Sequence, residues 1–140
     1  QKVLRECIPF LKIGMDPAVL FVGSRNVGAP GPGAGTYTVA KAGLTQMARL
    51  AAIELSKYQI RVNTIHPDSV YDTGVWTSKT LKSRADKYGL SIQDYKRRNL
   101  LKKDVTSSDV AELAVFLTSP KSSKTTGAQI PIDGGNDRII

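Results

Sequence analysis

Tyr37 and Lys41 stand four positions apart in a segment rich in alanine and leucine, a composition that predicts a helix. Side chains at positions i and i+4 share one face of a helix, so the phenol and the ammonium are expected to lie close together. A tyrosine, with an ordinary pKa of about 10, is a poor base at neutral pH, but a neighbouring positive charge stabilises the phenolate and lowers that pKa. The pair therefore predicts a general acid/base, although the same spacing occurs by chance on many helices.

Ser24 lies 13 positions before Tyr37, directly after Gly23 and the apolar run at residues 18–22. Such a short run is typical of a strand buried on both faces of a parallel sheet. Open parallel sheets bind ligands at the carboxyl ends of their strands. The Ser24 hydroxyl could there hydrogen-bond a substrate oxygen beside Tyr37; the alternative is that Ser24 is an ordinary turn residue.

Two loops flank these residues. Residues 66–74 follow the short strand expected at 60–65 and should lie at the same edge of the sheet, with His66 interpreted as a structural histidine. Residues 25–36 are rich in glycine and proline, but they do not satisfy Gly-x-Gly-x-x-Gly, and their prolines lack the N–H groups that a phosphate needs. We interpret this second loop as a spacer leading to Tyr37.

Periodicity and chain-breaking residues place these positions on alternating helices and strands. Helices are expected over residues 2–15, 37–57, 77–88, 91–101 and 107–117, and strands over residues 18–22, 60–65 and 128–132. Ser107 is expected to cap the last helix. The alternation predicts an α/β fold with a parallel sheet and right-handed crossovers.

Composition excludes several classes of protein. The 140 residues are 41% hydrophobic, which suits one packed domain rather than a disordered chain. The net charge is +8, from 20 basic and 12 acidic residues, and the excess is concentrated in residues 79–103. We interpret it as the solvated side of two helices, because no aromatic interleaving or nucleic-acid motif accompanies it.

Membrane and metal partners are not expected either. No apolar stretch approaches the roughly 18 residues that cross a bilayer, and the first residues do not resemble a signal peptide. The single cysteine, Cys7, cannot form a disulfide within the chain, which fits a reducing compartment and a cytoplasmic protein. No ligand spacing predicts a metal site.

Four motifs in order resemble the short-chain dehydrogenase/reductase family. They are a serine ending a strand, Tyr-x-x-x-Lys 13 residues on, Arg-Val-Asn-Thr-Ile at residues 61–65 before a proline loop, and Thr-Gly-x-x-x-x-x-Asp-Gly-Gly at residues 126–135. The resemblance covers essentially the whole chain. It implies the carboxy-terminal half of a Rossmann-type doubly wound parallel sheet, and an NAD(P)-dependent oxidoreductase that transfers hydride between an alcohol carbon and nicotinamide.

The same resemblance implies residue roles. Tyr37 is the catalytic acid/base, Lys41 lowers its pKa and binds the nicotinamide ribose, and Ser24 orients the substrate carbonyl or hydroxyl. The residues implied to contact the NAD or NADP cofactor are Tyr37, Lys41, Pro67, Asp68, Val70 and Thr73. Asp68 stands where the family usually has glycine, and Thr73 lies one position further along than usual.

The family's Gly-rich phosphate loop, its acidic ribose-binding residue and its catalytic asparagine would precede Gln1. Residues 1–140 are therefore expected to form a partial domain that by itself binds cofactor weakly or not at all and is inactive. A non-catalytic fragment, acting only as a structural or interaction module, is the alternative.

A narrower similarity concerns the substrate. Residues 23–27, 29–33, 66–68, 72–76, 95–101 and 134–138 look like the dehydrogenase portion of the bifunctional rhamnulose-1-phosphate aldolase/lactaldehyde dehydrogenase family. This similarity implies a small hydroxyaldehyde such as lactaldehyde as substrate, within rhamnose metabolism.

Two further features are implied for the segments around the site. Residues 74–103 would cover the substrate, with Trp76, Tyr88 and Tyr95 lining the pocket or packing into the core. The 37–57 helix would pack against its copy in a homo-oligomer. Small residues that would permit this contact are Ala42, Ala48, Ala51 and Ala52, unless they pack within the subunit.

Overall fold

The computed structural model describes residues 1–136, so positions 137–138 of the last motif lie outside the described residues. Its sheet has three parallel strands in the order β1-β2-β3: β1 (Ala18–Val22), β2 (Arg61–Pro67) and β3 (Gln129–Ile132). The prediction of an α/β fold with a parallel sheet is confirmed. Because all three strands run the same way, their carboxyl ends meet at one edge.

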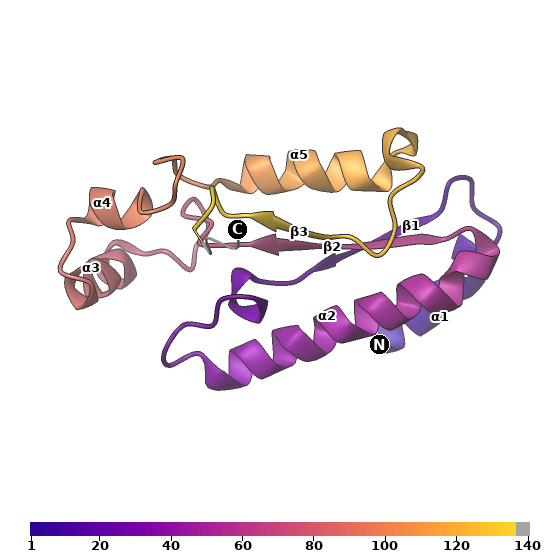
Figure 1. Ribbon diagram of the computed structural model, residues 1–140, viewed down its shortest axis with the longest axis horizontal. Coiled ribbons are helices and arrows are strands. Elements are labelled where there is room, and N and C mark those ends of the chain that lie inside the picture. Colours follow the sequence, from indigo (N-terminus) through magenta and orange to yellow (C-terminus); the bar gives the residue numbers. More distant parts are fainter. Residues whose placement is uncertain (137–140) are drawn as a thin grey trace.

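The helices form a layer on each face of the sheet (Figure 1). Helices α1 (Lys2–Leu11) and α2 (Gly35–Leu55) cover one face, and α5 (Ser107–Thr118) covers the other. Helices α3 (Ser78–Lys87) and α4 (Ile92–Lys96) extend beyond the edge where the strands end. Short 3-10 turns follow β1 at Arg25–Val27, α2 at Ser56–Tyr58 and α5 at Pro120–Ser122.

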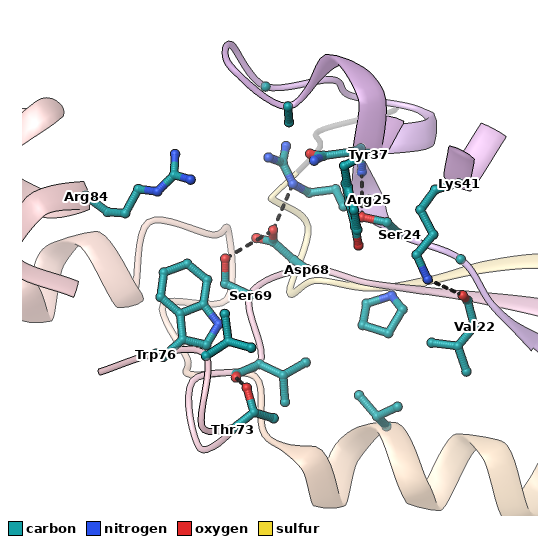
Figure 2. A pocket seen from close by; sticks show the side chains of 18 of the residues that line it. Val22, Ser24, Arg25, Tyr37, Lys41, Asp68, Ser69, Thr73, Trp76 and Arg84 are labelled. Atoms are coloured by element: carbon teal, nitrogen blue, oxygen red, sulfur yellow. Dashed lines mark hydrogen bonds and ion pairs between the residues drawn. The ribbon is translucent and has the colours of Figure 1, made fainter. Parts of the chain in front are cut away.

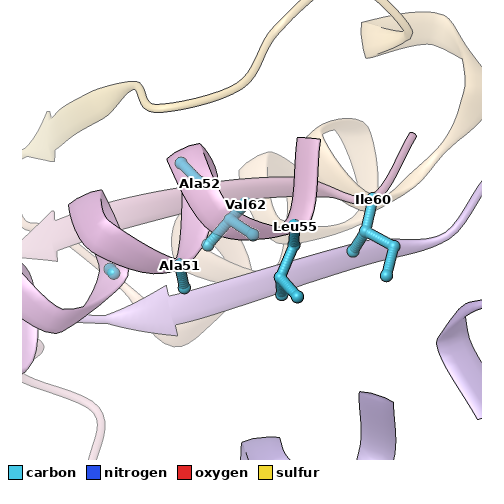
Figure 3. Close-up of a cluster of buried hydrophobic side chains, with 6 residues drawn as sticks. Ala51, Ala52, Leu55, Ile60 and Val62 are labelled. Atoms are coloured by element: carbon cyan, nitrogen blue, oxygen red, sulfur yellow. The ribbon is translucent and has the colours of Figure 1, made fainter. Parts of the chain in front are cut away.

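The main core lies between α2 and the sheet (Figure 3). Its buried members are Ala48, Ala51, Ala52, Leu55, Ile60 and Val62, and the apolar side of α1 packs against them. Small alanine side chains let α2 approach the strands closely, which brings the start of the helix near the end of β1. Three of the four alanines predicted to face a partner subunit are thus buried within this chain.

Polar residues inside β2 anchor the connection between α5 and β3. The Arg61 guanidinium donates to the carbonyls of Leu117 (2.7 Å) and Ser119 (3.1 Å), which terminate α5. Buried Asn63 donates to Thr125 O (2.9 Å) and accepts from the Ala128 amide (3.1 Å). These bonds satisfy backbone groups that burial would otherwise leave unpaired.

Some predicted boundaries were wrong. The helix expected over 2–15 ends at Leu11, and the helix expected over 91–101 ends at Lys96. In the second case the Asn99 side chain bonds both backbone groups of Lys103, so residues 97–103 turn instead of continuing the helix. The cap of α5 is Thr106, paired with Asp109 in a capping box, and not Ser107.

Within residues 1–136, no helix is long and apolar enough to cross a membrane.

Candidate active site

A cavity of about 800 Å³ opens at the carboxyl ends of the strands (Figure 2). The loops after β1 and β2, the start of α2 and the α3–α4 segment surround it. Every residue predicted for the site lines this cavity: Ser24, Tyr37, Lys41, Pro67, Asp68, Val70 and Thr73. Positions that lie far apart in the sequence are therefore gathered around one space.

Tyr37 and Lys41 lie in the first turns of α2, which begins at Gly35, two residues earlier than expected. The Lys41 ammonium is 5.8 Å from the centre of the Tyr37 ring. It also donates to the carbonyl of Val22 at the end of β1 (2.8 Å), which ties the helix to the strand. An ammonium has three donors, so two remain for a ligand. The Tyr37 side chain is 49% exposed and faces the cavity.

Ser24 follows β1 and is buried. Its Oγ accepts the Asn26 amide (3.2 Å), which begins the 3-10 turn Arg25–Val27. A hydroxyl that accepts one bond still has its hydrogen to donate. The arrangement therefore leaves Ser24 able to hydrogen-bond a substrate oxygen in the cavity that Tyr37 and Lys41 also line.

His66, the penultimate residue of β2, lies against Ser24. Its Nδ1 is 3.2 Å from the Ser24 amide nitrogen and 3.0 Å from the Ser24 carbonyl oxygen, and its Nε2 is 2.8 Å from Gln129 Oε1. The ring is only 9% exposed. It is a buried, hydrogen-bonded histidine, as the sequence predicted.

Asp68 joins loops from three parts of the chain. Its Oδ1 accepts from Arg25 Nε (2.9 Å). Its Oδ2 accepts from the side-chain amide Nδ2 of Asn136 and lies 3.6 Å from Arg98 Nη2. The Asp68 amide donates to Ile132 O (3.1 Å). The carboxylate and the amide of Asp68 are thus engaged by the protein itself, and its carbonyl is the group left for a ligand.

The rest of the β2 loop is held in a fixed turn. Val70 forms a parallel bridge with Val105, and the Thr73 hydroxyl donates to Val70 O (2.8 Å). Trp76 N donates to Thr73 O (3.1 Å), which brings its indole to the cavity wall. This turn keeps Val70 and Thr73 facing the space beside Ser24.

An aromatic cluster adjoins the cavity: Trp76, Tyr88 and Tyr95 line it, and Tyr71, which does not, packs against Trp76 and Tyr95. Tyr71 lies 5.0 Å from Trp76 and 6.4 Å from Tyr95 between ring centres, and Tyr88 lies 5.7 Å from Tyr95. The sequence left open whether Tyr88 and Tyr95 line the pocket or pack into the core. Both line the cavity, and Tyr95 is also buried, whereas Tyr88 is half-exposed. Burial raises the pKa of Tyr71, which therefore stays a neutral phenol and is a poorer base.

Three arginines of the cavity were missed: Arg25, Arg84 and Arg98. Arg98 stacks on the Tyr95 ring (4.2 Å), donates to the Tyr71 hydroxyl (3.0 Å) and faces Asp68. The sequence interpretation had placed it on a solvated helix face, and no local pattern separates it from its exposed basic neighbours. Arg25 could have been predicted as a cavity residue from its position directly after Ser24.

Residues 1–136 contain no group of three or more His, Cys, Asp or Glu side chains arranged to hold a metal ion. The cavity instead presents hydroxyl and ammonium donors beside an aromatic wall. Such a donor set suits the ribose hydroxyls and the carboxamide of a nicotinamide nucleotide, together with a small oxygen-bearing substrate.

Comparison with known proteins identifies the family. A family model described as enoyl-(acyl carrier protein) reductase matches residues 1–137. A Bacillus subtilis protein described as an uncharacterized oxidoreductase is 37% identical over 123 residues, which are 84% of this chain and 18% of that protein.

Two solved structures share the fold. One is a short-chain dehydrogenase family protein from Francisella tularensis, with 33% identity, a TM-score of 0.80, and coverage of 97% of this chain and 56% of that chain. The other is 3-ketoacyl-(acyl-carrier-protein) reductase from Brucella melitensis complexed with NADH, with 28% identity, a TM-score of 0.78, and coverage of 96% and 52%. The chain thus spans about half the length of these two structures, and less of the Bacillus protein. It belongs to the short-chain dehydrogenase/reductase family.

Proposed function

We propose that residues 1–140 form the catalytic half of an NAD(P)-dependent oxidoreductase acting on a small alcohol or aldehyde. One observation carries the proposal: Ser24, Tyr37 and Lys41 line a single cavity, with the Lys41 ammonium held 5.8 Å from the Tyr37 ring. Relatives named as oxidoreductases support it.

A nicotinamide cofactor held in this cavity would supply the hydride acceptor for oxidation of the alcohol carbon and the hydride donor for reduction of the carbonyl carbon. Tyr37 takes the hydroxyl proton during oxidation and returns it to the carbonyl oxygen during reduction. The Lys41 ammonium stabilises the phenolate that remains once that proton has left. Ser24 donates a hydrogen bond to the same substrate oxygen and holds it beside Tyr37.

The cofactor contacts proposed for this chain all come from the cavity wall. Lys41, with two free donors, would hold the ribose hydroxyls beside Tyr37, and the Pro67–Asp68 backbone, Val70 and Thr73 would hold the carboxamide. We place the phosphate-binding part in a preceding half-domain of the complete protein, because this chain spans about half of its solved relatives.

For the substrate we propose a small hydroxyaldehyde such as lactaldehyde. The motif similarity to the aldolase/lactaldehyde dehydrogenase proteins supports this choice. The Bacillus relative is also far longer than the matched region, as a dehydrogenase joined to another domain would be. Because Cys7 is the single cysteine and has no partner for a disulfide within the chain, we place the reaction in the cytoplasm.

The test uses the protein expressed from its complete reading frame, assayed with lactaldehyde and with NAD and NADP in both directions. We expect Tyr37→Phe to lower kcat by about 10²- to 10⁴-fold, because it removes the acid/base group. Tyr58→Phe, on the surface outside the cavity, is the matched control and should keep wild-type activity.

Full activity of Tyr37→Phe would overturn the assignment of the acid/base. If the complete protein neither binds NAD(P) nor turns over any alcohol or aldehyde, the chain serves as a structural module instead. Turnover of other alcohols without lactaldehyde would overturn only the substrate.

A further inference from the structure

His66 occupies an unusual place, because its ring fills the space where residue 23 would carry a side chain. A Cβ built on Gly23 would lie 2.5 Å from His66 Nδ1 and 2.6 Å from Cε1, far inside van der Waals contact. The Gly23 amide is fixed by a bond to Ile65 O (2.8 Å). The absence of a side chain at Gly23 is therefore what allows the ring to reach the backbone of Ser24.

Hydrogen bonds orient the ring from its other side. Gln129 Nε2 is 3.3 Å from Thr64 Oγ1, which turns Gln129 Oε1 towards His66 Nε2 at 2.8 Å. His66 Nε2 faces this amide oxygen, and Nδ1 lies 3.2 Å from the Ser24 amide nitrogen and 3.0 Å from the Ser24 carbonyl oxygen, so the ring contacts both backbone groups of Ser24. A chain of contacts thus runs from Thr64 on β2, through Gln129 on β3, to Ser24 after β1.

The Ser24 backbone is where this chain of contacts ends. Ser24 is extended (φ −165°, ψ 148°), and its Oγ bonds the Asn26 amide. These contacts hold both the backbone and the Oγ of Ser24, so they set the position of a hydroxyl that lines the cavity. A displacement of about 1 Å at such a group can cost about 10²-fold in rate.

We infer that His66 is a positioning residue, which acts through Ser24 to place the hydroxyl that holds the substrate oxygen. The inference rests on the proposed function and extends it to a residue that does not line the cavity. Gly23 and Gln129 support this role. Gly23 leaves space for the His66 ring, and Gln129 fixes the orientation of the ring.

The experiment compares three substitutions in the complete protein. His66→Asn keeps a polar group at the place of Nδ1, His66→Gln keeps a polar group only at the place of Nε2, and His66→Leu keeps volume alone. We expect Leu and Gln to lower kcat by about 10- to 100-fold with the KM for cofactor unchanged, and Asn to keep most of the activity. A purely structural role would lower thermal stability without this ordering of kcat.

A double-mutant cycle shows whether His66 acts through Ser24. On a Ser24→Ala background, His66→Leu should lower kcat no further, because the hydroxyl that it positions is already gone. An equal loss on both backgrounds, or full activity of His66→Leu, would overturn the inference.

Two more measurements separate folding and function. Gly23→Ala, which displaces the ring by its Cβ, should reproduce the kcat loss of His66→Leu, whereas Gly14→Ala, where a Cβ meets only ordinary contacts at 3.5 and 3.6 Å, should not. The NMR shift of the Ser24 amide should change in the Leu and Gln variants and stay near wild type in Asn. If the wild-type protein turns over no substrate but the Ser24 amide shifts follow this order, the proposed function is wrong while His66 still positions Ser24. Unchanged Ser24 amide shifts in all three His66 variants would overturn the positioning role of His66.

Discussion

At the scale of single residues, Asp68 stands where the family resemblance led us to expect glycine. It is a largely buried carboxylate that faces Arg25 and Arg98. The two guanidinium groups are also partly buried, and removing one member of such a group leaves the others without compensation. We therefore expect removal of any one charge among Asp68, Arg25 and Arg98 to lower the stability of the fold.

We expect Asp68→Asn to lower the free energy of unfolding by about 2–3 kcal/mol, because the charge between the two arginines is lost. Asp86→Asn, on the exposed side of α3, is the control and should change it by less than about 0.5 kcal/mol. Urea unfolding of the complete protein measures both. Equal stability of the two variants would show that Asp68 does not hold the loops together.

At the scale of elements, two carboxylates, one from the loop after β2 and one within α5, accept hydrogen bonds from the backbone at the start of α5. Asp72 accepts from the Ser107 hydroxyl (2.6 Å) and amide (2.9 Å), which lowers the pKa of Asp72. Asp109 accepts from the Thr106 hydroxyl (2.7 Å) and amide (2.8 Å), which lowers the pKa of Asp109. Asp72 also ties the loop of the site to the helix, so the start of α5 and the cavity are linked.

A carboxyl with a lowered pKa in the folded state stabilises the protein above its unfolded pKa of about 3.9, and this contribution is lost as the pH falls further. We expect Asp72→Asn to have a lower Tm than wild type at about pH 6, and the gap to close below about pH 3. Thermal unfolding followed by circular dichroism measures the gap. A gap that is independent of pH would contradict the assignment.

At the scale of the whole molecule, α2 has an outward side that this chain leaves uncovered. Leu50 is 53% exposed and Ile53 is 73% exposed, whereas Ala48, Ala51 and Ala52 face the core. We propose that the homo-oligomer expected from the sequence uses this outer side rather than the alanines. Burial of apolar side chains would be the driving force.

Replacing Leu50 and Ile53 together by glutamate should then shift the complete protein to smaller species, because buried charges disfavour the contact. Leu101→Glu, at an exposed leucine beyond α4, is the control and should leave the assembly unchanged. Analytical ultracentrifugation distinguishes the species. An unchanged mass of the double variant would place the contact elsewhere.

The same scales explain what the sequence could predict. Short strand-like runs were sufficient to predict the parallel sheet, and the spacing of Ser24, Tyr37 and Lys41 was sufficient to expect these three residues together, because both depend on local pattern. Pro67, Asp68, Val70 and Thr73 came from the family resemblance instead. The shortening of the helix after Ile92 depends on Asn99 bonding the backbone of Lys103, a competition that periodicity does not contain. The contacts of Arg98 and His66 join residues far apart in the sequence, so only the folded chain shows them.

The bridge between Val70 and Val105 has a consequence for engineering. Beyond the end of β2, the chain passes Val70, forms the α3–α4 wall of the cavity, and returns at Val105 directly beside Val70. Residues 71–104 thus form a cassette whose two ends already meet. Grafting a relative's corresponding segment at these two valines would exchange the segment that we expect to cover the substrate, while Ser24, Tyr37 and Lys41 stay in place.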